Sequence, residues 1–168
     1  MHESFSQPDR RAVISGIGIS AMGAMLVTPA AATDADKSSK DNAAREKQNT
    51  EVVTNFCKAW SGKDVEKLIP FISAEIEYHM FEGAPPIKGV EQFKERLGGF
   101  MAGMKEINWE IFRSQAMGDI VINERIDHFI QAAGSKRPDN HFHITGVFLV
   151  REGKIVYWKD YNMPVKAP

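Results

Sequence analysis

Hydrophobic positions follow helical spacing in the first part of the chain and alternate with polar positions in most of the second. Apolar residues recur at the i, i+1, i+4, i+5 and i+8 positions over 52–60, which predicts an amphipathic helix that Gly62 ends. A short second helix is predicted over 65–70, with Asp64 as its N-cap. A third helix is predicted to open at Val90.

The remaining stretches alternate between apolar and polar residues, which is typical of half-buried β-strands. The predicted strands cover residues 76–81, 107–116, 121–129, 141–151 and 154–162. The last four are joined by turns and by a long hairpin connection over 131–140. Helices gathered at the start, with hairpin-linked strands after them, predict an α+β fold with a mostly antiparallel sheet. We expect this sheet to curve around the N-terminal helices and to enclose a cone-shaped pocket.

The predicted strand over 121–129 has an unusual distribution of charge between its two faces. One face carries Val121, Asn123, Arg125, Asp127 and Phe129, and the other carries Ile122, Glu124, Ile126, His128 and Ile130. The second face is the more apolar one and would ordinarily be the core face. Arg125 and Asp127 are about 7 Å apart along the backbone, which is close enough for an ion pair. Two interpretations follow: a surface ion pair on a solvated face, or a charged pair inside the pocket.

The last two predicted strands supply further candidate pocket residues. In 141–151 one face is wholly apolar and includes Gly146, which leaves room at that point or permits a bend. In 154–162 Asp160 shares a face with Trp158 and Asn162, which is unusual for an apolar core. The residues alone leave open whether Asp160 lies in the pocket or at the exposed end of the sheet.

Composition and charge exclude several classes of function. The chain has 168 residues, of which 43% are apolar and 26% charged, and its net charge is −1, as is ordinary for a globular domain. No region is strongly basic, so we predict no nucleic-acid partner. The single cysteine, Cys57, excludes an internal disulfide, and its helical context predicts a buried packing thiol.

Histidines at metal-ligand spacing raise the question of a metal site. His141 and His143 share one strand face, and His128 and His79 are further imidazoles in the chain. No acidic or third ligand falls on the same strand face as the His-x-His pair. We therefore predict surface or packing histidines and no metal site.

The first 32 residues have the parts of an export signal. Arg10-Arg11 precede a weakly hydrophobic, glycine-containing run over 12–27, and an Ala-x-Ala site follows. We predict a twin-arginine-type signal peptide over 1–32, cleaved after Ala32, and a periplasmic mature protein. The alternative is a retained N-terminal anchor, but the apolar run is shorter than the roughly 20 residues that a membrane span needs, so we expect no stable membrane insertion.

The mature chain is predicted to have two parts. Residues 33–47 are polar and charged and are expected to form a flexible leader. Residues 48–168 are expected to form a single α+β domain, which is long enough to bury a core of its own.

Several short motifs occur in the order and spacing of a known enzyme family. They are Tyr78, Pro85-Pro86 with Gly89, Glu124-Arg125-Ile126-Asp127, Gly146-Val147-Phe148, Glu152-Gly153-Lys154-Ile155 and Trp158-Lys159-Asp160-Tyr161. Through them the chain resembles the limonene-1,2-epoxide hydrolase family, within the SnoaL-like and nuclear-transport-factor-like fold, over residues 49–162. The resemblance implies a cone-shaped curved sheet, a homodimer, a small-molecule substrate and no cofactor.

The resemblance also implies catalytic roles. Asp127, Arg125 and Asp160 match the family's Asp-Arg-Asp triad, in which one aspartate activates water and the other, protonated, gives its proton to the epoxide oxygen. Arg125 holds both carboxylates, and Tyr78 helps to position the water. By resemblance Asp160 is the base and Asp127 the acid, whereas the residues alone do not order them. The residue types suit this chemistry, because burial and mutual repulsion raise a carboxyl pKa in a dry pocket.

One position departs from the family pattern. Met80 stands two residues beyond Tyr78, where the family has an asparagine that helps to hold the water. Asn162, on the strand face of Asp160, is a candidate replacement. The departure keeps a second interpretation open: a cofactor-free lyase, isomerase or cyclase that uses Asp160 as a base on an aromatic or polyketide-like substrate. A third interpretation is a non-catalytic small-molecule binding module.

The expected pocket wall is apolar and rich in aromatic residues. Besides Met80 and Asn162, it comprises Phe100, Met104, Trp109, Phe129, Phe142, Ile144 and Trp158. Each of these residues alone is more typical of core packing. As a set they predict a bulky terpenoid or aromatic substrate with few charges.

Overall fold

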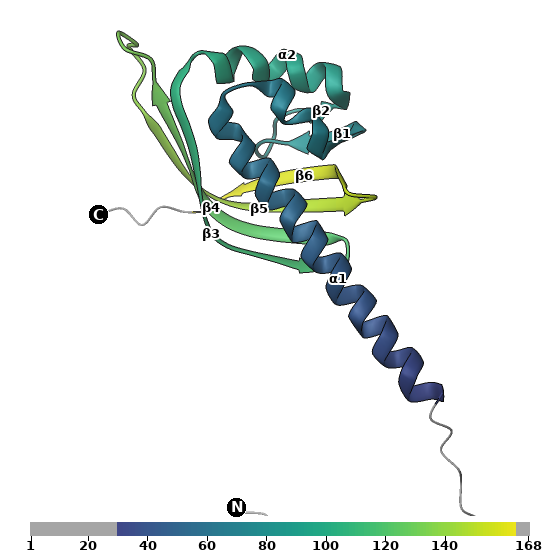
Figure 1. Cartoon of the computed structure of the whole chain (residues 1–168). Helices are drawn as coiled ribbons and strands as arrows, with labels where there is room; N and C mark the ends of the chain where they lie inside the picture. The colour runs from purple at the N-terminus through teal and green to yellow at the C-terminus, as the bar shows by residue number, and fades with distance from the viewer. Residues whose placement is uncertain (1–29, 164–168) are drawn as a thin grey trace, which may run out of the picture.

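The computed structural model describes residues 30–163, with side chains from Asp36 onward (Figure 1). Its helices are α1 (Ala30–Ala59) and α2 (Gly89–Ala102), and its short 3-10 turns are η1 (Trp60–Gly62), η2 (Val65–Lys67) and η3 (Ile69–Phe71). Its strands are β1 (Ile72–His79), β2 (Ile87–Lys88), β3 (Met104–Met117), β4 (Ile120–Gln131), β5 (Asn140–Arg151) and β6 (Lys154–Asn162).

The six strands form one sheet in the order β2-β1-β6-β5-β4-β3. Neighbouring strands are antiparallel except for β1 and β6, which run parallel. The sheet curls around the C-terminal half of α1, and α2 lies across its upper end (Figure 1). The predicted α+β fold with a curved, mostly antiparallel sheet is confirmed.

Register shifts bend the long strands. The pairing of β3 with β4 shifts between Met104 and Glu106 and again between Ile111 and Arg113. A β-bulge sets two residues of one strand against one of its partner and increases the local twist. Beyond the second shift the alternation of β3 is broken, so Phe112 and Arg113 are both exposed.

The C-terminal half of α1 packs into the concave face of the sheet. Val53, Phe56 and Cys57 are fully buried, and the Phe56 ring meets Trp158 edge-on with 5.2 Å between ring centroids. The amphipathic helix predicted over 52–60 is thus confirmed. Burial raises the pKa of the Cys57 thiol to about 12, so the thiol stays neutral, as expected of a packing residue.

Residues 33–47, which were predicted to form a flexible leader, are helical and belong to α1. Its alanines, lysines and glutamate are strong helix formers, and ion pairs one turn apart, such as Lys40 Nζ to Asp36 Oδ2 at 2.8 Å, add local support. The helix is also tied to the sheet, because the Gly118 N–H in the β3–β4 turn donates to Glu46 Oε1 at 2.8 Å.

Two smaller predictions are also corrected. The helix predicted over 65–70 is two 3-10 turns, η2 and η3, because Pro70 has no N–H to continue an α-helix. The predicted cap is present, since Asp64 accepts a hydrogen bond from the Glu66 N–H at 3.0 Å. The short strand β2 was not predicted from the sequence.

Most of the predicted export signal, residues 1–29, lies outside the described part of the chain, whereas residues 30–32 open α1. Between residues 30 and 163, no helix combines the length and the apolar character needed to cross a membrane.

Candidate active site

Arg125 lies at the centre of the concave face of β4 and is completely buried. Gly146 on β5, which pairs with Asn123 of β4 and with Asp160 of β6, makes room for it. A Cβ at Gly146 would overlap Arg125 Nη1 and would lie 2.8 Å from Asn123 Oδ1 and 2.7 Å from Phe148 Cε2. The missing side chain of Gly146 therefore leaves the space on the concave face that the guanidinium occupies.

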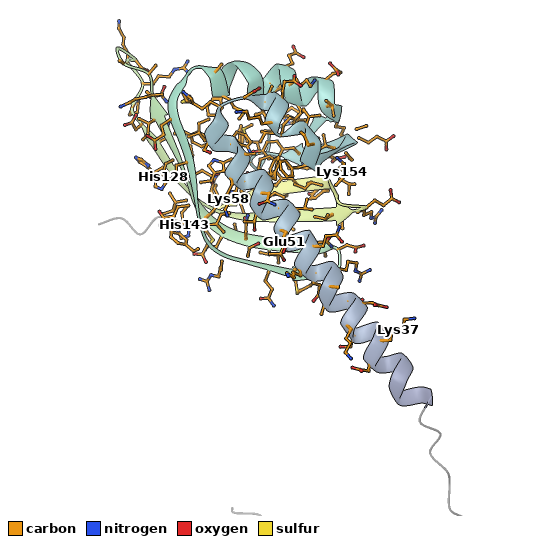
Figure 2. All side chains as sticks on the ribbon, in the orientation of Figure 1. Lys37, Glu51, Lys58, His128, His143 and Lys154 are labelled. Atoms are coloured by element: carbon orange, nitrogen blue, oxygen red, sulfur yellow. The ribbon has the colours of Figure 1, made fainter. Side chains whose placement is uncertain are left out.

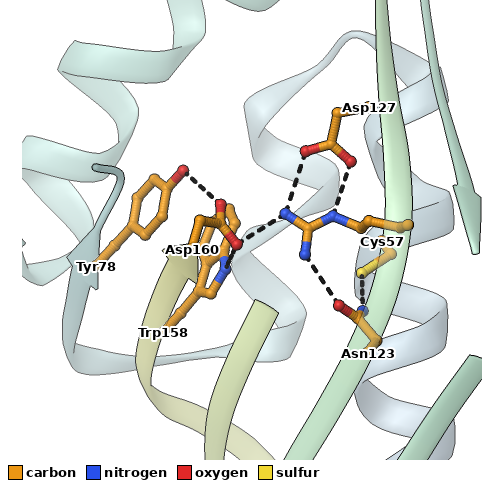
Figure 3. Close-up of polar contacts among 7 residues, drawn as sticks. Cys57, Tyr78, Asn123, Asp127, Trp158 and Asp160 are labelled. Carbon is orange, nitrogen blue, oxygen red and sulfur yellow. Dashed lines mark hydrogen bonds and ion pairs between the residues drawn. The ribbon is translucent and has the colours of Figure 1, made fainter. Parts of the chain in front are cut away.

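The guanidinium binds two carboxylates and an amide (Figure 3). Arg125 Nε and Nη2 donate to the two oxygens of Asp127 at 2.7 and 3.1 Å, and Nη2 also donates to Asp160 Oδ1 at 2.8 Å. Arg125 Nη1 donates to Asn123 Oδ1 at 3.0 Å. The guanidinium carbon lies 4.4 Å from the centroid of the Trp109 ring, so the cation is also stacked on an aromatic face.

Asp160 receives hydrogen bonds from three different side chains. Besides Arg125, Trp158 Nε1 donates to its Oδ1 at 2.7 Å, and the Tyr78 hydroxyl donates to its Oδ2 at 3.1 Å. The Tyr78 and Trp158 rings stack with 3.5 Å between centroids, which holds both donors in place. Asp127 has a single donor residue, Arg125, so the two carboxylates have different environments.

Burial dominates the electrostatics of this cluster. It raises the pKa of Asp127 to about 7 and also raises the pKa of Asp160, while Arg125 opposes the shift in both cases. Burial also raises the pKa of Tyr78 well above its ordinary value, so its hydroxyl remains a hydrogen-bond donor. The extra donors to Asp160 favour its ionised form, and the pKa of Asp127 leaves a proton on that residue near neutral pH. One acid and one base can therefore coexist.

Both carboxylates line a pocket of about 480 Å³, whereas Arg125 is buried behind them. This volume lies within the range of about 300–1,000 Å³ that is usual for small-molecule sites. The sequence-predicted residues that line it are Tyr78, Met80, Phe100, Trp109, Asp127, Phe129, Phe142, Ile144, Asp160 and Asn162.

Two of the predicted wall residues do not line the pocket. Met104 and Trp158 are buried members of the hydrophobic core. Met104 stands beside the first register shift of β3, where strand alternation does not give the facing of a side chain. Trp158 stacks on Tyr78 and contributes to the site by its hydrogen bond to Asp160.

Other residues at the site were missed. The pocket is also lined by Trp60, Phe81, Arg96, Leu97 and Asn140. Trp60, Arg96 and Leu97 lie on helices, where strand alternation gives no signal. Phe81 ended the predicted strand over 76–81, and alternation put it on the face opposite Tyr78 and Met80, but β1 ends at His79 and Phe81 lies beyond it. Asn123 was identifiable from alternation, because it shares the strand face of Arg125 and Asp127. It is buried, and its amide Nδ2 lies 3.4 Å from Cys57 Sγ.

The four histidines within residues 36–163 do not line the pocket. His128 and His143 are on the side of the sheet that faces away from α1 (Figure 2). His128 Nδ1 lies 2.7 Å from His141 Nδ1, and His143 Nε2 lies 2.8 Å from Glu124 Oε1. Within residues 30–163 no group of three or more histidine, cysteine, aspartate or glutamate side chains is arranged to hold a metal ion.

A model of the limonene-1,2-epoxide hydrolase catalytic domain matches residues 47–164. The chain belongs to the limonene-1,2-epoxide hydrolase family. The family resemblance carried by the sequence motifs is thus confirmed, and with it an enzyme family that acts on small molecules.

Solved structures agree with this family and with its fold. An LEH-like epoxide hydrolase from M. tuberculosis superposes with a TM-score of 0.60 at 25% identity, covering 70% of this chain and 84% of that one. The epoxide hydrolase/cyclase-like enzyme SalBIII, of pyran ring formation in the polyether salinomycin, superposes with a TM-score of 0.62 at 16% identity, covering 70% and 92%. A protein from Jannaschia sp. CCS1, assigned as a SnoaL-like polyketide cyclase, superposes with a TM-score of 0.57 at 13% identity, covering 70% and 87%.

Proposed function

We propose that this family member is a cofactor-independent epoxide hydrolase that adds water to a bulky apolar epoxide, terpenoid or aromatic. One observation carries the proposal: Asp127 and Asp160 are both bound to Arg125 and both face the same apolar pocket. Their unequal hydrogen bonding separates an acid from a base, which is what the opening of an epoxide by water requires.

In this mechanism Asp160 takes a proton from a water molecule, and the water oxygen attacks one carbon of the epoxide ring. The carbon–oxygen bond of the ring breaks, and protonated Asp127 donates its proton to the departing oxygen. The product is a diol, with the proton of the water on Asp160 and Asp127 ionised. Asp160 then releases a proton to solvent and Asp127 takes one up, which restores the starting state. Arg125 contacts both carboxylates throughout and compensates the negative charge at each stage.

We propose that Asn162 helps Tyr78 to hold the attacking water. Asn162 lines the pocket with Asp160, whereas the Asn123 amide is already bound to Arg125 and Cys57. Met80 also lines the pocket, but its thioether is a weak acceptor and donates nothing. Asn162→Ala is expected to lower kcat, and Met80→Asn in that background to restore part of it. Unchanged turnover in both Asn162→Ala and Met80→Asn would remove this role.

Turnover in oxygen-18 water tests the hydrolase proposal. Purified residues 33–168 would be screened on terpenoid and aromatic epoxides, and the products analysed by mass spectrometry. One labelled oxygen in a diol product is expected. Asp119→Asn, which changes an aspartate outside the pocket, is expected to retain this turnover. Asp119 lies in the β3–β4 turn and pairs with Arg45 at 3.6 Å. A diol without label would contradict hydrolysis by solvent water.

The second candidate function is a cofactor-free lyase, isomerase or cyclase on an aromatic or polyketide-like substrate. Methionine at position 80 favours it, because the pocket then has fewer groups to hold water. Conversion of such a substrate without oxygen-18 uptake, abolished by Asp160→Asn, would establish it in place of hydrolysis. A binding module, the third candidate, would show ligand affinity without turnover and would be insensitive to Asp160→Asn.

We further propose that the protein is exported by the twin-arginine route and is a homodimer. The composition of residues 1–32 supports export, and the exposed Phe112 and Tyr161 on the sheet support burial by a partner. Arg10→Lys with Arg11→Lys is expected to retain the precursor in the cytoplasm. Light scattering of residues 33–168 is expected to give twice the mass of the chain, and a monomer mass would exclude the dimer.

A further inference from the structure

Arg96 of α2 lines the pocket and is exposed to solvent, so it lies at the pocket mouth, and the proposed hydrolysis does not use its charge. At one end of α2 the Phe93 ring lies 6.4 Å from that of Tyr78, and at the other the Phe100 ring lies 5.1 Å from that of Phe129. Arg96 follows Phe93 by three residues and precedes Phe100 by four, so all three share one face of the helix. The helix therefore places the Arg96 guanidinium over the opening of the pocket.

The charge of Arg96 is not neutralised within residues 36–163, where no carboxylate lies within ion-pair distance of it. Lys94, two residues earlier on the same helix, pairs with Glu66 at 3.0 Å. The acidic groups that line the pocket, Asp127 and Asp160, are both bound to Arg125. The mouth of the pocket therefore has a cation without a carboxylate partner. At the floor of the pocket, formed by Asp127 and Asp160, both carboxylates are already paired with Arg125.

The strand register gives the spacing between these two charged zones. Phe142 pairs with Asp127, and Asn140, two residues nearer the hairpin end, pairs with Phe129. Asn140 also lines the pocket, so it lies about 7 Å farther out than Asp127 along the strands. The walls at these two levels are apolar and include Phe129 and Phe142. The pocket thus has a reactive floor, an aromatic middle and a polar, cationic mouth.

We propose that the substrate carries a carboxylate, which binds Arg96 at the mouth with Asn140 as a further donor. The apolar body of the substrate fills the aromatic middle, and its reactive end faces Asp160; only this last part rests on the proposed function. A carboxylate at the mouth gains a charge-assisted hydrogen bond from the guanidinium. The same group placed at the floor would face two aspartates, so the charge also sets the direction in which the substrate enters.

Binding of a matched ligand pair tests this proposal without turnover. 6-Phenylhexanoic acid and 6-phenylhexanamide have the same body, and their binding to the purified full chain can be followed by tryptophan fluorescence or by calorimetry. The parent protein is expected to bind the acid about tenfold more tightly than the amide, as for a partly solvated charge-assisted hydrogen bond. This preference is expected to weaken as salt increases.

Two single variants of α2 separate a specific site from general charge. Arg96→Gln is expected to abolish the preference for the acid, whereas Lys94→Gln removes the same charge from the same helix and is expected to retain it. Equal binding of acid and amide by the parent, no binding of either, or a preference that survives Arg96→Gln would each overturn the proposal. An intact preference for the acid without turnover of any epoxide acid would instead overturn the proposed hydrolase function.

Discussion

Each of the two faces of the sheet carries an arginine–carboxylate pair at β4, with opposite consequences for the carboxyl pKa. On the concave face Arg125 and Asp127 are 0% and 6% exposed, and burial raises the pKa of Asp127. On the convex face Arg113 of β3 and Glu124 are 80% and 21% exposed, and hydrogen bonds with His143 and Arg113 lower the pKa of Glu124. Both carboxylates are hydrogen-bonded to an arginine, but only on the concave face does desolvation outweigh this pairing and raise the carboxyl pKa. Of these two carboxyl groups, only Asp127 on the concave face therefore has a pKa near neutral pH.

The largest expected difference between the two faces is in catalysis. Asp160→Asn is expected to lower kcat by about 10²–10⁴, the usual contribution of a general base. Glu124→Gln removes a carboxylate from the other face of the sheet and is expected to leave kcat unchanged. Steady-state kinetics on the best epoxide of the turnover screen would measure both. Equal losses in the two variants would mean that the catalytic role is not on the concave face.

The next difference is in stability. Arg125→Met leaves two buried carboxylates without their cation, and the free energy of unfolding is expected to fall by about 3–5 kcal/mol. Arg113→Met breaks an exposed pair and is expected to change it by no more than about 0.5 kcal/mol. Urea unfolding of both variants would make the comparison. A similar loss in each would show that burial does not separate the two pairs.

Room for the buried arginine can be tested at Gly146. Gly146→Ala places a Cβ against Arg125 and Asn123, and the overlap is expected to cost about 1–3 kcal/mol of unfolding free energy. Gly99→Ala on α2 is the matched control, since a Cβ there meets nothing within 4 Å. It is expected to stabilise the helix by up to about 1 kcal/mol. Urea unfolding with loss of stability in Gly99→Ala alone would contradict this packing argument.

The smallest expected effect is a pH dependence of opposite sign on the two faces. With a folded-state pKa of about 7, Asp127 contributes stability that is full at low pH and is lost as pH rises through that value. The lowered pKa of Glu124 contributes stability that is present above the ordinary glutamate pKa and is lost as pH falls. Asp127→Asn is expected to flatten a decline in urea midpoint between about pH 5 and 7, and Glu124→Gln to leave that decline in place. A decline that persists unchanged in Asp127→Asn would exclude this titration.

Alternation and spacing predicted much of this fold and brought the candidate site residues to attention. The strand over 121–129 was predicted from its period of two, which also put Arg125 and Asp127 on one face. The resemblance added Asp160 and Tyr78, and all four lie together in the structure. Arg96 and Asn140 escaped prediction, because their place at the mouth depends on how α2 and the β4–β5 hairpin pack. Such contacts leave no local periodicity to detect.

The sequence by itself determined the class of fold, the strand faces and the family, since these depend on local periodicity and on short motifs. It did not determine which face of β4 points inward. By hydrophobicity the face with Ile122 and Ile126 was the better core face, yet these residues lie on the convex side and are only partly buried. The tertiary structure decided otherwise because the space at Gly146 and donors distant along the chain, such as Tyr78 and Trp158, satisfy the buried charges. Charged groups can be buried only where such partners converge, and that convergence exists only in the folded chain.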